Sequence, residues 1–170
     1  MKQFSLFVLL LLCGAMLTSS AQDLTSVNFH LKDINGKDQS FQKYLDKVKA
    51  GGEKGAILLS FWAMWCEPCK QEMKSLVETY NKLKDKNFHY IAINLDNPRS
   101  LAKVKAYVTS QKLPYEFWMD PNSEAFKKLN GQSMPYSLLV DRDGKLIAKH
   151  TGFIPGDEKK LEDEIRSIVE

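Results

Sequence analysis

The sequence has few of the residues that metal sites and disulfide frameworks need. Its 170 residues include three cysteines and three histidines, and the histidines stand singly on strand-like segments. The formal net charge is only +3, which does not favour nucleic acid or an anionic membrane as a partner. The sequence also lacks repeats, low-complexity tracts and long linkers. These features leave a single globular domain as the simplest organisation.

The sequence has no apolar run long enough to form a typical membrane span. Its main apolar run, residues 4–12, is shorter than the ~20 residues that cross a bilayer. The run follows a positively charged start and precedes small residues that end at Ala21, which is the pattern of a secretory signal peptide. We predict a signal peptide over residues 1–21 and a mature domain over residues 22–170. This domain would be exported to the periplasm or cell envelope without stable membrane insertion.

Cys13 leaves a second interpretation of this segment open. A cysteine here can be acylated in a lipoprotein, but the bulky Leu12 stands where a small residue normally precedes the lipidated cysteine. Cleavage after Ala21 is favoured, with lipidation of Cys13 as the alternative. Cys66 and Cys69 then remain, and a bridge across so short a loop stabilises a fold very little. In an oxidising compartment, this pair indicates redox chemistry rather than a structural bond.

Hydrophobic periodicity predicts alternating strands and helices. Asn35-Gly36 between two alternating runs indicates an N-terminal β-hairpin, and residues 56–62 are typical of a fully buried strand. Apolar residues three and four apart after Cys69 indicate an amphipathic helix. We expect further strands at residues 88–95, 115–119, 136–140 and 145–150, and further helices at residues 41–48, from a cap at Ser100 to residue 111, and at residues 123–129 and 157–169. This order predicts an α/β fold with a central mixed sheet flanked by helices.

The spacing of Cys66 and Cys69 suits a dithiol that closes and reopens. Cys66 stands where a helix begins, so free backbone N–H groups and the positive end of the helix dipole lower the pKa of its thiol. Pro68 fits the first helical turn, where a missing N–H costs nothing. We expect Cys66 to be the exposed nucleophile and Cys69 to be the resolving thiol. We expect neither a cofactor nor a metal, because half a zinc site lacks its second pair of ligands.

Residues 61–70, Phe-Trp-Ala-Met-Trp-Cys-Glu-Pro-Cys-Lys, resemble the active-site signature of the thioredoxin superfamily. The Cys-Glu-Pro-Cys variant, the upstream hairpin and the longer central segment resemble its TlpA/ResA-like branch of exported thiol-disulfide oxidoreductases. Met134-Pro135 before a strand, the turn at residues 141–144 and Thr151-Gly152 extend the likeness over nearly the whole mature chain. The resemblance implies a thioredoxin-like fold with an N-terminal β-hairpin and a central insertion.

The resemblance also implies roles for residues outside the dithiol. Pro135 matches the cis-proline that faces the dithiol, and Met134 matches the residue whose backbone pairs with the substrate. Glu72 matches a glutamate beneath the dithiol. Burial there would raise the pKa of its carboxyl and let it relay the proton of Cys69. A solvated glutamate in the first helical turns is the alternative. Ser60 stands where many thioredoxins have a buried acid.

Other positions near the cysteines are expected to affect binding, reactivity or helix shape. Trp65 lies beside the nucleophile and would offer a flat apolar docking surface. Glu67, like Pro68, lies between the cysteines; we expect its side chain to be exposed and its charge to tune the thiolate. Lys74 stands where many relatives have a helix-kinking proline, so we expect the helix to run straighter here.

The sequence favours a thiol-disulfide oxidoreductase that reduces disulfides of client proteins. A membrane electron donor and a client of the cytochrome c maturation type would fit this role. Two alternatives stay open: an oxidant that donates its disulfide to folding proteins, and a non-catalytic chaperone or copper-delivery module. A difference of ~30 mV corresponds to only about 1.4 kcal/mol, so the sequence does not decide the direction of electron flow.

Overall fold

The computed structural model describes residue 24 and residues 27–170. The predicted signal peptide, residues 1–21, and Cys13 lie outside the described residues. Within the described part, no helix combines the length and the apolar character needed to cross a bilayer.

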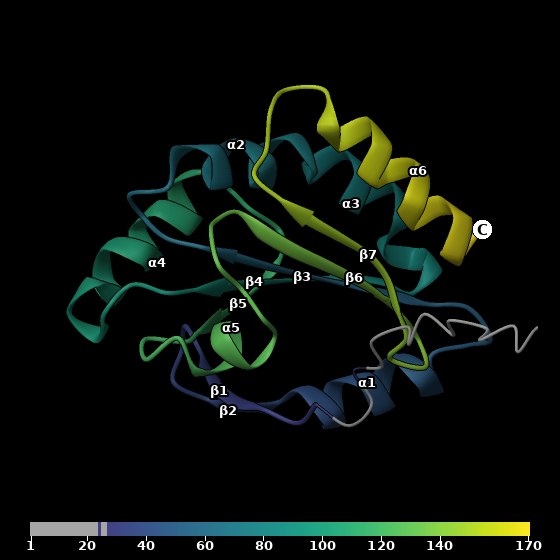
Figure 1. Ribbon diagram of the computed structural model, residues 1–170, viewed down its shortest axis with the longest axis horizontal. Coiled ribbons are helices and arrows are strands. Elements are labelled where there is room, and N and C mark those ends of the chain that lie inside the picture. Colours follow the sequence, from purple (N-terminus) through teal and green to yellow (C-terminus); the bar gives the residue numbers. More distant parts are fainter. Residues whose placement is uncertain (1–23, 25–26) are drawn as a thin grey trace, which may run out of the picture.

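A mixed sheet of seven strands forms the centre of the structure (Figure 1). The strands are β1 (His30–Asp33), β2 (Asp38–Ser40), β3 (Ala56–Trp62), β4 (Phe88–Asn94), β5 (Glu116–Met119), β6 (Tyr136–Asp141) and β7 (Leu146–Thr151). They lie in the order β2-β1-β5-β4-β3-β6-β7. β4 pairs in parallel with β3 and β5, whereas β6 pairs antiparallel with β3 and β7. The predicted mixed sheet is confirmed.

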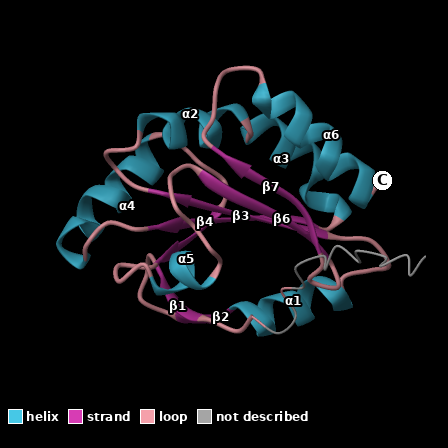
Figure 2. Cartoon of the chain, viewed as in Figure 1, coloured by secondary structure: helices cyan, strands magenta, loops and turns pink. Residues whose placement is uncertain are grey.

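Helices cover both faces of the sheet (Figures 1 and 2). They are α1 (Phe41–Ala50), α2 (Glu67–Ser75), α3 (Val77–Leu83), α4 (Leu101–Ser110), α5 (Glu124–Lys128) and α6 (Asp157–Val169), with 3-10 turns η1 (Lys84–Lys86) and η2 (Pro98–Ser100). Residues of α2, α3, α4 and α6 share one apolar cluster, and residues of α1 and α5 share the other. The sheet therefore separates two cores, as expected for this α/β fold.

β3 supplies both cores because its side chains alternate between the two faces of the sheet. Leu58 and Trp62 belong to the cluster beneath α2, whereas Leu59 and Phe61 belong to the cluster above α1. Every residue of the strand is buried. The absence of a polar face in this stretch of sequence is explained by its central position between β4 and β6.

The two additions to the central sheet also form as predicted. β1 and β2 pair antiparallel around the turn, in which Gly36 has a φ of 86°. The Asp33 side chain closes this turn by accepting hydrogen bonds from the backbone N–H groups of Asn35 and Lys37. The central insertion between β4 and β6 consists of η2, α4, β5 and α5. Through β5, it extends the sheet towards the hairpin.

The helical segment after the cysteines is interrupted, and the straighter helix expected from Lys74 is wrong. α2 ends at Ser75, and α3 begins two residues later, with Leu76 between them. Ser75 Oγ donates a hydrogen bond of 2.9 Å to the backbone carbonyl of Glu72, which also accepts the Leu76 N–H at 3.2 Å. The helix is therefore interrupted at Leu76 without a proline.

The predicted cap of the next helix is also wrong. Ser100 makes no side-chain capping bond, and its dihedral angles are already helical. The 3-10 turn η2 comes first, and Asn97 Oδ1 accepts the backbone N–H of Arg99 at 3.0 Å. The capping role therefore falls on Asn97, because it is the last residue with extended backbone before the turn.

Phe41 packs α1 against the sheet, and its replacement tests the apolar cluster that α1 and α5 share. Its ring is fully buried and stacks on Phe29 with 4.9 Å between ring centroids. We predict that Phe41→Ala lowers the free energy of unfolding by about 3–5 kcal/mol, because it opens a cavity. Urea denaturation measures this loss. Lys43→Ala, at an exposed position of the same helix, should change the stability by less than ~0.5 kcal/mol. Equal losses in the two variants would contradict this assignment.

Candidate active site

The two cysteines lie at the point where β3 gives way to α2. Cys66 is the N-cap residue of α2 and forms a disulfide with Cys69, with 5.4 Å between their Cα atoms. The Cys69 N–H points at Cys66 Sγ across 3.3 Å. The predicted placement at a helix N-terminus is therefore confirmed. In the reduced protein, this N–H and the helix dipole would stabilise a Cys66 thiolate.

The expectation of an exposed nucleophile is wrong for this disulfide form. Only 4% of Cys66 is exposed, and Cys69 is fully buried. Both side chains belong to the apolar cluster that also contains Ala63 and Met73. Cys66 is nevertheless the more accessible cysteine, as an attacking thiol requires.

Glu67 is exposed, as expected, and is paired with a lysine. Its carboxylate lies 2.7 Å from Lys70 Nζ, one turn further along α2. The hydrogen bond and charge of Lys70 lower the pKa of the Glu67 carboxyl. Because the lysine partly neutralises this carboxylate, Glu67 opposes a thiolate on Cys66 less than an unpaired acid would.

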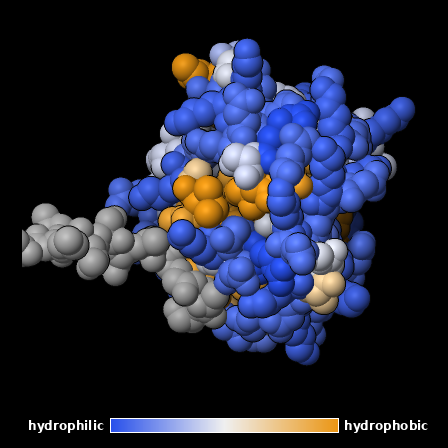
Figure 3. All heavy atoms as spheres, turned by 90° about the vertical axis from the view of Figure 1, so that its right-hand side faces the viewer, coloured by the Kyte–Doolittle hydropathy of each residue, from blue (hydrophilic) through white to orange (hydrophobic). Residues whose placement is uncertain are grey.

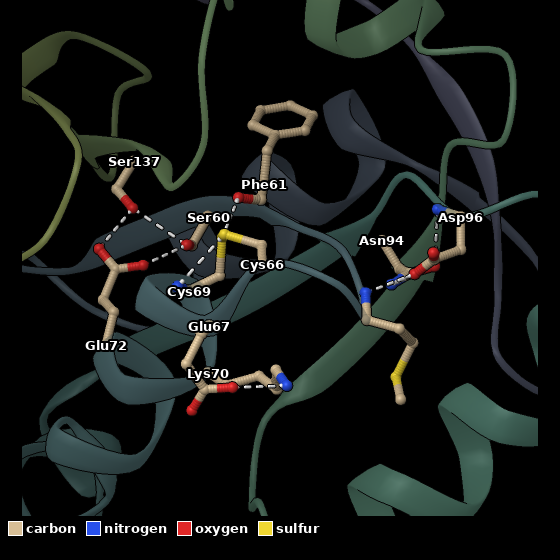
Figure 4. The surroundings of a disulfide bond; sticks show 11 residues. Ser60, Phe61, Cys66, Glu67, Cys69, Lys70, Glu72, Asn94, Asp96 and Ser137 are labelled. Carbon is tan, nitrogen blue, oxygen red and sulfur yellow. Dashed lines mark hydrogen bonds and ion pairs between the residues drawn. A yellow bond between two sulfur atoms is a disulfide. The ribbon is translucent and has the colours of Figure 1, made fainter.

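Glu72 is buried beneath the dithiol, which contradicts the alternative of a solvated glutamate. Only 2% of the residue is exposed. Its carboxyl oxygens lie 2.7 Å from Ser60 Oγ and 2.9 Å from Ser137 Oγ (Figure 4). Burial raises the pKa of the Glu72 carboxyl, and the hydrogen bonds of the two serines offset part of this rise. A carboxyl in this state can hold a proton at a pH where an ordinary glutamate is ionised.

The strand register explains why two serines meet this carboxyl. Ser60 on β3 and Ser137 on β6 are direct partners in an antiparallel pair, so their side chains lie on the same face of the sheet. That face is covered by α2, from which Glu72 reaches down. Sequence reasoning noted Ser60 but missed Ser137. The available signal was a single hydroxyl residue inside an otherwise apolar buried strand.

Pro135 lies at the amino end of β6, beside the carboxyl end of β3. The Met134–Pro135 peptide bond is cis, as the resemblance implied. The Pro135 carbonyl oxygen accepts the N–H of Gly152 at 2.8 Å, which joins this loop to the end of β7. Met134 is partly buried against the cluster that contains both cysteines. Their roles in substrate binding remain predictions.

Asp96 holds the loop in front of Cys66 and was missed by sequence reasoning. Its Oδ2 atom accepts the backbone N–H of Met64 at 2.7 Å and the side-chain amide of Asn94 at 2.8 Å (Figure 4). The polar residues directly after the strand at residues 88–94 were the available signal. A carboxylate that accepts two hydrogen bonds fixes the path of the chain into the dithiol.

Two exposed apolar side chains lie at the same edge of the sheet as the dithiol. Trp65 is 74% exposed and follows β3, and Ile154 is 68% exposed and follows β7. Because β6 is antiparallel to both strands, the carboxyl ends of β3 and β7 meet at one edge.

Figure 3 shows the end of the molecule that carries the C-terminus, which is mainly hydrophilic with a smaller hydrophobic area. There, Lys54 and Lys86 bind Glu170.

The histidines lie apart on strands, as expected. His30 is on β1, His89 on β4 and His150 on β7. His89 contacts Tyr44, and His150 lies 2.7 Å from the carboxylate of Glu164. Among the residues that the structure describes, no group of three histidine, cysteine or acidic side chains is arranged to hold a metal ion.

Comparisons with known proteins agree with this geometry. Residues 19–165 match the Redoxin family. The chain is 29% identical to the thiol-disulfide oxidoreductase ResA of Bacillus thuringiensis subsp. konkukian, over 98% of this chain and 95% of that protein. It is 31% identical to ResA of Bacillus cereus strain ATCC 10987, over 84% and 75%. A Chlorobium tepidum crystal structure, assigned as the thiol:disulfide interchange protein DsbE, superposes with a TM-score of 0.72. It shares 28% identity over 84% of this chain and 94% of that chain.

Because Glu72 is buried, we predict that the free energy of unfolding of the disulfide form depends on pH. Its pKa is raised in the folded state, so the folded protein keeps this proton to a higher pH than the unfolded chain does. The stabilisation is complete below the ordinary carboxyl pKa and is lost as pH rises through the raised pKa. We therefore expect the wild type to lose stability relative to Glu72→Gln as pH rises from acid towards neutral.

Urea denaturation of the disulfide form across this pH range measures the difference. Gln is the appropriate replacement, because its amide donates to one serine and accepts from the other, as a protonated acid does. Glu53→Gln, at an exposed loop position, serves as the control and should follow the wild-type profile. Parallel profiles for wild type and Glu72→Gln would show that Glu72 does not titrate with a raised pKa.

Proposed function

Since the chain belongs to the Redoxin family and is a ResA-like thiol-disulfide oxidoreductase of the thioredoxin superfamily, we propose that it reduces disulfides in exported client proteins. One observation carries the proposal: the Cys66–Cys69 pair stands at a helix N-terminus with the buried carboxyl of Glu72 beneath it. This arrangement combines an activated thiol with a group that can take up a proton.

Each residue of the site has a role in the proposed exchange. The Cys66 thiolate attacks a client disulfide and forms a mixed disulfide, and one client sulfur leaves as a thiolate. Cys69 then attacks the Cys66 sulfur while its proton passes to Glu72. The Cys66–Cys69 bond forms, and the second client sulfur leaves. The dithiol has lost two electrons, and the client disulfide has gained them.

The burial of the dithiol supports reduction of clients rather than donation of a disulfide. Cys66 and Cys69 are 4% and 0% exposed. Apolar surroundings disfavour a thiolate on the fully buried Cys69, so they favour the closed disulfide over a reduced pair that carries this charge. A pair that closes readily is a reductant, whereas a strong oxidant requires a stabilised reduced form.

The compartment and the partners complete the proposal. The signal-peptide pattern in residues 1–21 supports export of a mature domain, residues 22–170, to the periplasm or cell envelope. In an oxidising compartment a reductant must be re-reduced, so a membrane electron donor is part of the proposal. Apoproteins of the cytochrome c type, whose cysteines must stay reduced, are the proposed clients.

The client is proposed to dock at the edge of the sheet that carries the dithiol. Trp65 offers an exposed ring beside the nucleophile. Met134 and Pro135 lie on the loop before β6 and would pair with an extended segment of the client around its cysteine. The large flat ring of Trp65 can bind a client with little loss of conformational entropy.

The redox midpoint of the Cys66/Cys69 pair tests the proposed direction of electron flow. Equilibration with dithiothreitol buffers should give a midpoint nearer to about −270 mV, as in thioredoxin, than to about −120 mV, as in a strong disulfide donor. In Cys69→Ala, resolution is blocked, so mixed disulfides with the client should accumulate and can be isolated. A midpoint at the oxidising end would replace the reductase proposal with disulfide donation.

Trp65→Ala tests client docking separately from thiol chemistry. We expect the rate with a protein disulfide to fall about tenfold (~1.4 kcal/mol), because the variant loses an aromatic contact. The rate with dithiothreitol should stay the same, because this small reagent does not need the docking surface. Ile147→Ala removes another exposed apolar side chain, 41% exposed on β7, and should change neither rate. If the rates with the protein disulfide and with dithiothreitol fall equally in Trp65→Ala, the Trp65 ring acts on the dithiol itself.

A further inference from the structure

The hydroxyl of Tyr115 reaches the helical segment that carries the dithiol. Tyr115 lies directly before β5 in the central insertion, and only 7% of it is exposed. Its Oη atom donates a hydrogen bond of 2.7 Å to the backbone carbonyl of Met73 in α2. Its ring meets the ring of Tyr80 in α3 edge-on, with 5.2 Å between the ring centroids. Since Met73 precedes the break at Leu76 and Tyr80 follows it, one side chain contacts the segment on both sides of the break.

The contact falls where the helical bonding of this segment stops. In an uninterrupted α-helix, the carbonyl of Met73 would accept the N–H of Val77, four residues further on. The Leu76 N–H still bonds the carbonyl of Glu72, but the next carbonyl, that of Met73, accepts the Tyr115 hydroxyl. A side chain that inserts into this ladder of bonds is one of the few causes of a sharp bend in a helix.

The two sides of the break pack on different parts of the structure. In α2, Glu72 contacts hydroxyl groups of β3 and β6. In α3, Thr79 Oγ1 donates a hydrogen bond of 2.8 Å to Glu162 of α6. Tyr80, also in α3, packs on Phe88 of β4 with 6.0 Å between the ring centroids. Both helices lie on the side of the sheet that α6 covers (Figure 1). The break therefore lets α2 keep its place over β3 and β6 while α3 follows its own partners.

The position of α2 decides whether the two sulfur atoms can meet. Cys66 caps α2 and Cys69 lies within it, and their Cα atoms are 5.4 Å apart in the disulfide. A disulfide forms only when two cysteines lie within a narrow range of distance and direction. Met73 is fully buried and follows Cys69 by about one helical turn. A bond that holds the backbone of Met73 therefore also holds the turn that carries Cys69.

We propose that Tyr115 is a positioning residue of the dithiol: its hydroxyl maintains the break in the helical segment and thereby keeps Cys69 within reach of Cys66. The inference rests on the proposed function, in which Cys69 attacks the Cys66 sulfur, the bond between the cysteines forms, and the bond to the client sulfur breaks. It gives the central insertion a role in the reaction, because Tyr115 belongs to that insertion. Tyr115 acts through the backbone of α2 rather than on the sulfur atoms.

A second tyrosine of the insertion contacts the same region and offers a matched control. The Tyr107 ring packs on Trp62, with 5.8 Å between the ring centroids, and its centroid lies 5.9 Å from Lys70 Nζ. Its hydroxyl oxygen is buried and has no hydrogen-bond partner among the described residues. Because Tyr107→Phe deletes no hydrogen bond, this replacement should be close to neutral. Tyr115→Phe, in contrast, removes the side-chain donor to the Met73 carbonyl.

Equilibration with dithiothreitol buffers tests whether Tyr115 acts on the dithiol. In Tyr115→Phe, we expect the equilibrium constant for disulfide closure to fall about tenfold, because Cys69 is held less firmly near Cys66. A tenfold fall moves the midpoint by about 30 mV towards more oxidising values. Tyr107→Phe should leave the midpoint unchanged.

The rate of closure gives a second readout of the same effect. When the reduced protein reacts with dithiobis-nitrobenzoate, the attack of Cys66 releases one nitrothiobenzoate and the attack of Cys69 releases the second. The second release should slow about tenfold in Tyr115→Phe, because it requires Cys69 to be in place. The first release should keep its rate, because Cys66 attacks a small reagent without help from Cys69.

Tyr44→Phe separates this effect from a general loss of stability. The Tyr44 hydroxyl donates a hydrogen bond of 2.6 Å to Glu116, and its ring belongs to the other apolar cluster. Its removal should lower the free energy of unfolding, measured by urea denaturation, without moving the midpoint. If Tyr115→Phe also loses stability but keeps the wild-type midpoint and closure rate, its role is merely structural and the proposal is overturned.

Restoring the bend by another route gives a direct comparison. A proline in a helix interior removes a backbone bond and bends the helix, and Lys74 is exposed and directly follows Met73. Tyr115→Phe combined with Lys74→Pro should regain most of the lost closure rate and return the midpoint towards the wild-type value. Tyr115→Phe combined with Lys74→Ala should not. If the proline and alanine double variants behave alike, the hydroxyl does not act through the break, and the proposal is overturned.

The comparison between variants does not depend on the direction of electron flow. An oxidising midpoint in the wild type would refute the reductase proposal, and the midpoint of Tyr115→Phe would still differ from it. Equal midpoints in the wild type and Tyr115→Phe, both in the reducing range, would refute the role of Tyr115 alone.

Discussion

The structure of the site depends on one buried interaction, the contact of the Glu72 carboxyl with hydroxyl groups on β3 and β6. An acid without partners in this position would cost several kcal/mol. The contact requires that Ser60 and Ser137 be direct partners in the sheet and that α2 cross the same face. Strand register, helix position and dithiol geometry are thus coupled, because Cys66 caps the helix that contains both Cys69 and Glu72.

The direction of the strands brings the remaining parts of the site together. β3 and β7 end, and β6 begins, at one edge of the sheet. The loop with Cys66, the loop before Pro135 and the loop after Thr151 are therefore neighbours, although they are far apart in the sequence. Polar residues just beyond β4 complete the arrangement, since Asp96 fixes the backbone at Met64. These loops form an ordered site because each is attached to the end of a strand in the sheet.

Local patterns were sufficient to predict most of the fold. Alternation and apolar runs located β3 and the hairpin, and the cysteine spacing located the start of α2. The errors share a physical cause: each depended on a contact that local patterns do not show. Near the break at Leu76, the carbonyl oxygen of Met73 accepts a hydrogen bond from the distant Tyr115 hydroxyl. The burial of Cys66 depends on the cluster beneath it, and the role of Ser137 on a partner 77 residues away in sequence. The cis bond at Pro135 was accessible through the family resemblance, since most bonds before proline are trans.

The outer strands of the sheet have a consequence for selectivity among extended peptides. β2 has only three residues and carries an ion pair between Asp38 and Lys32 of its neighbour, and β7 alternates partly buried and exposed side chains, including Lys149. Short or charged edges resist the addition of a foreign strand. An unfolded chain therefore gains little by annealing to the flanks of this protein. Recognition is concentrated at the end of the sheet that carries the dithiol, and the charged outer strands discourage self-association into fibrils.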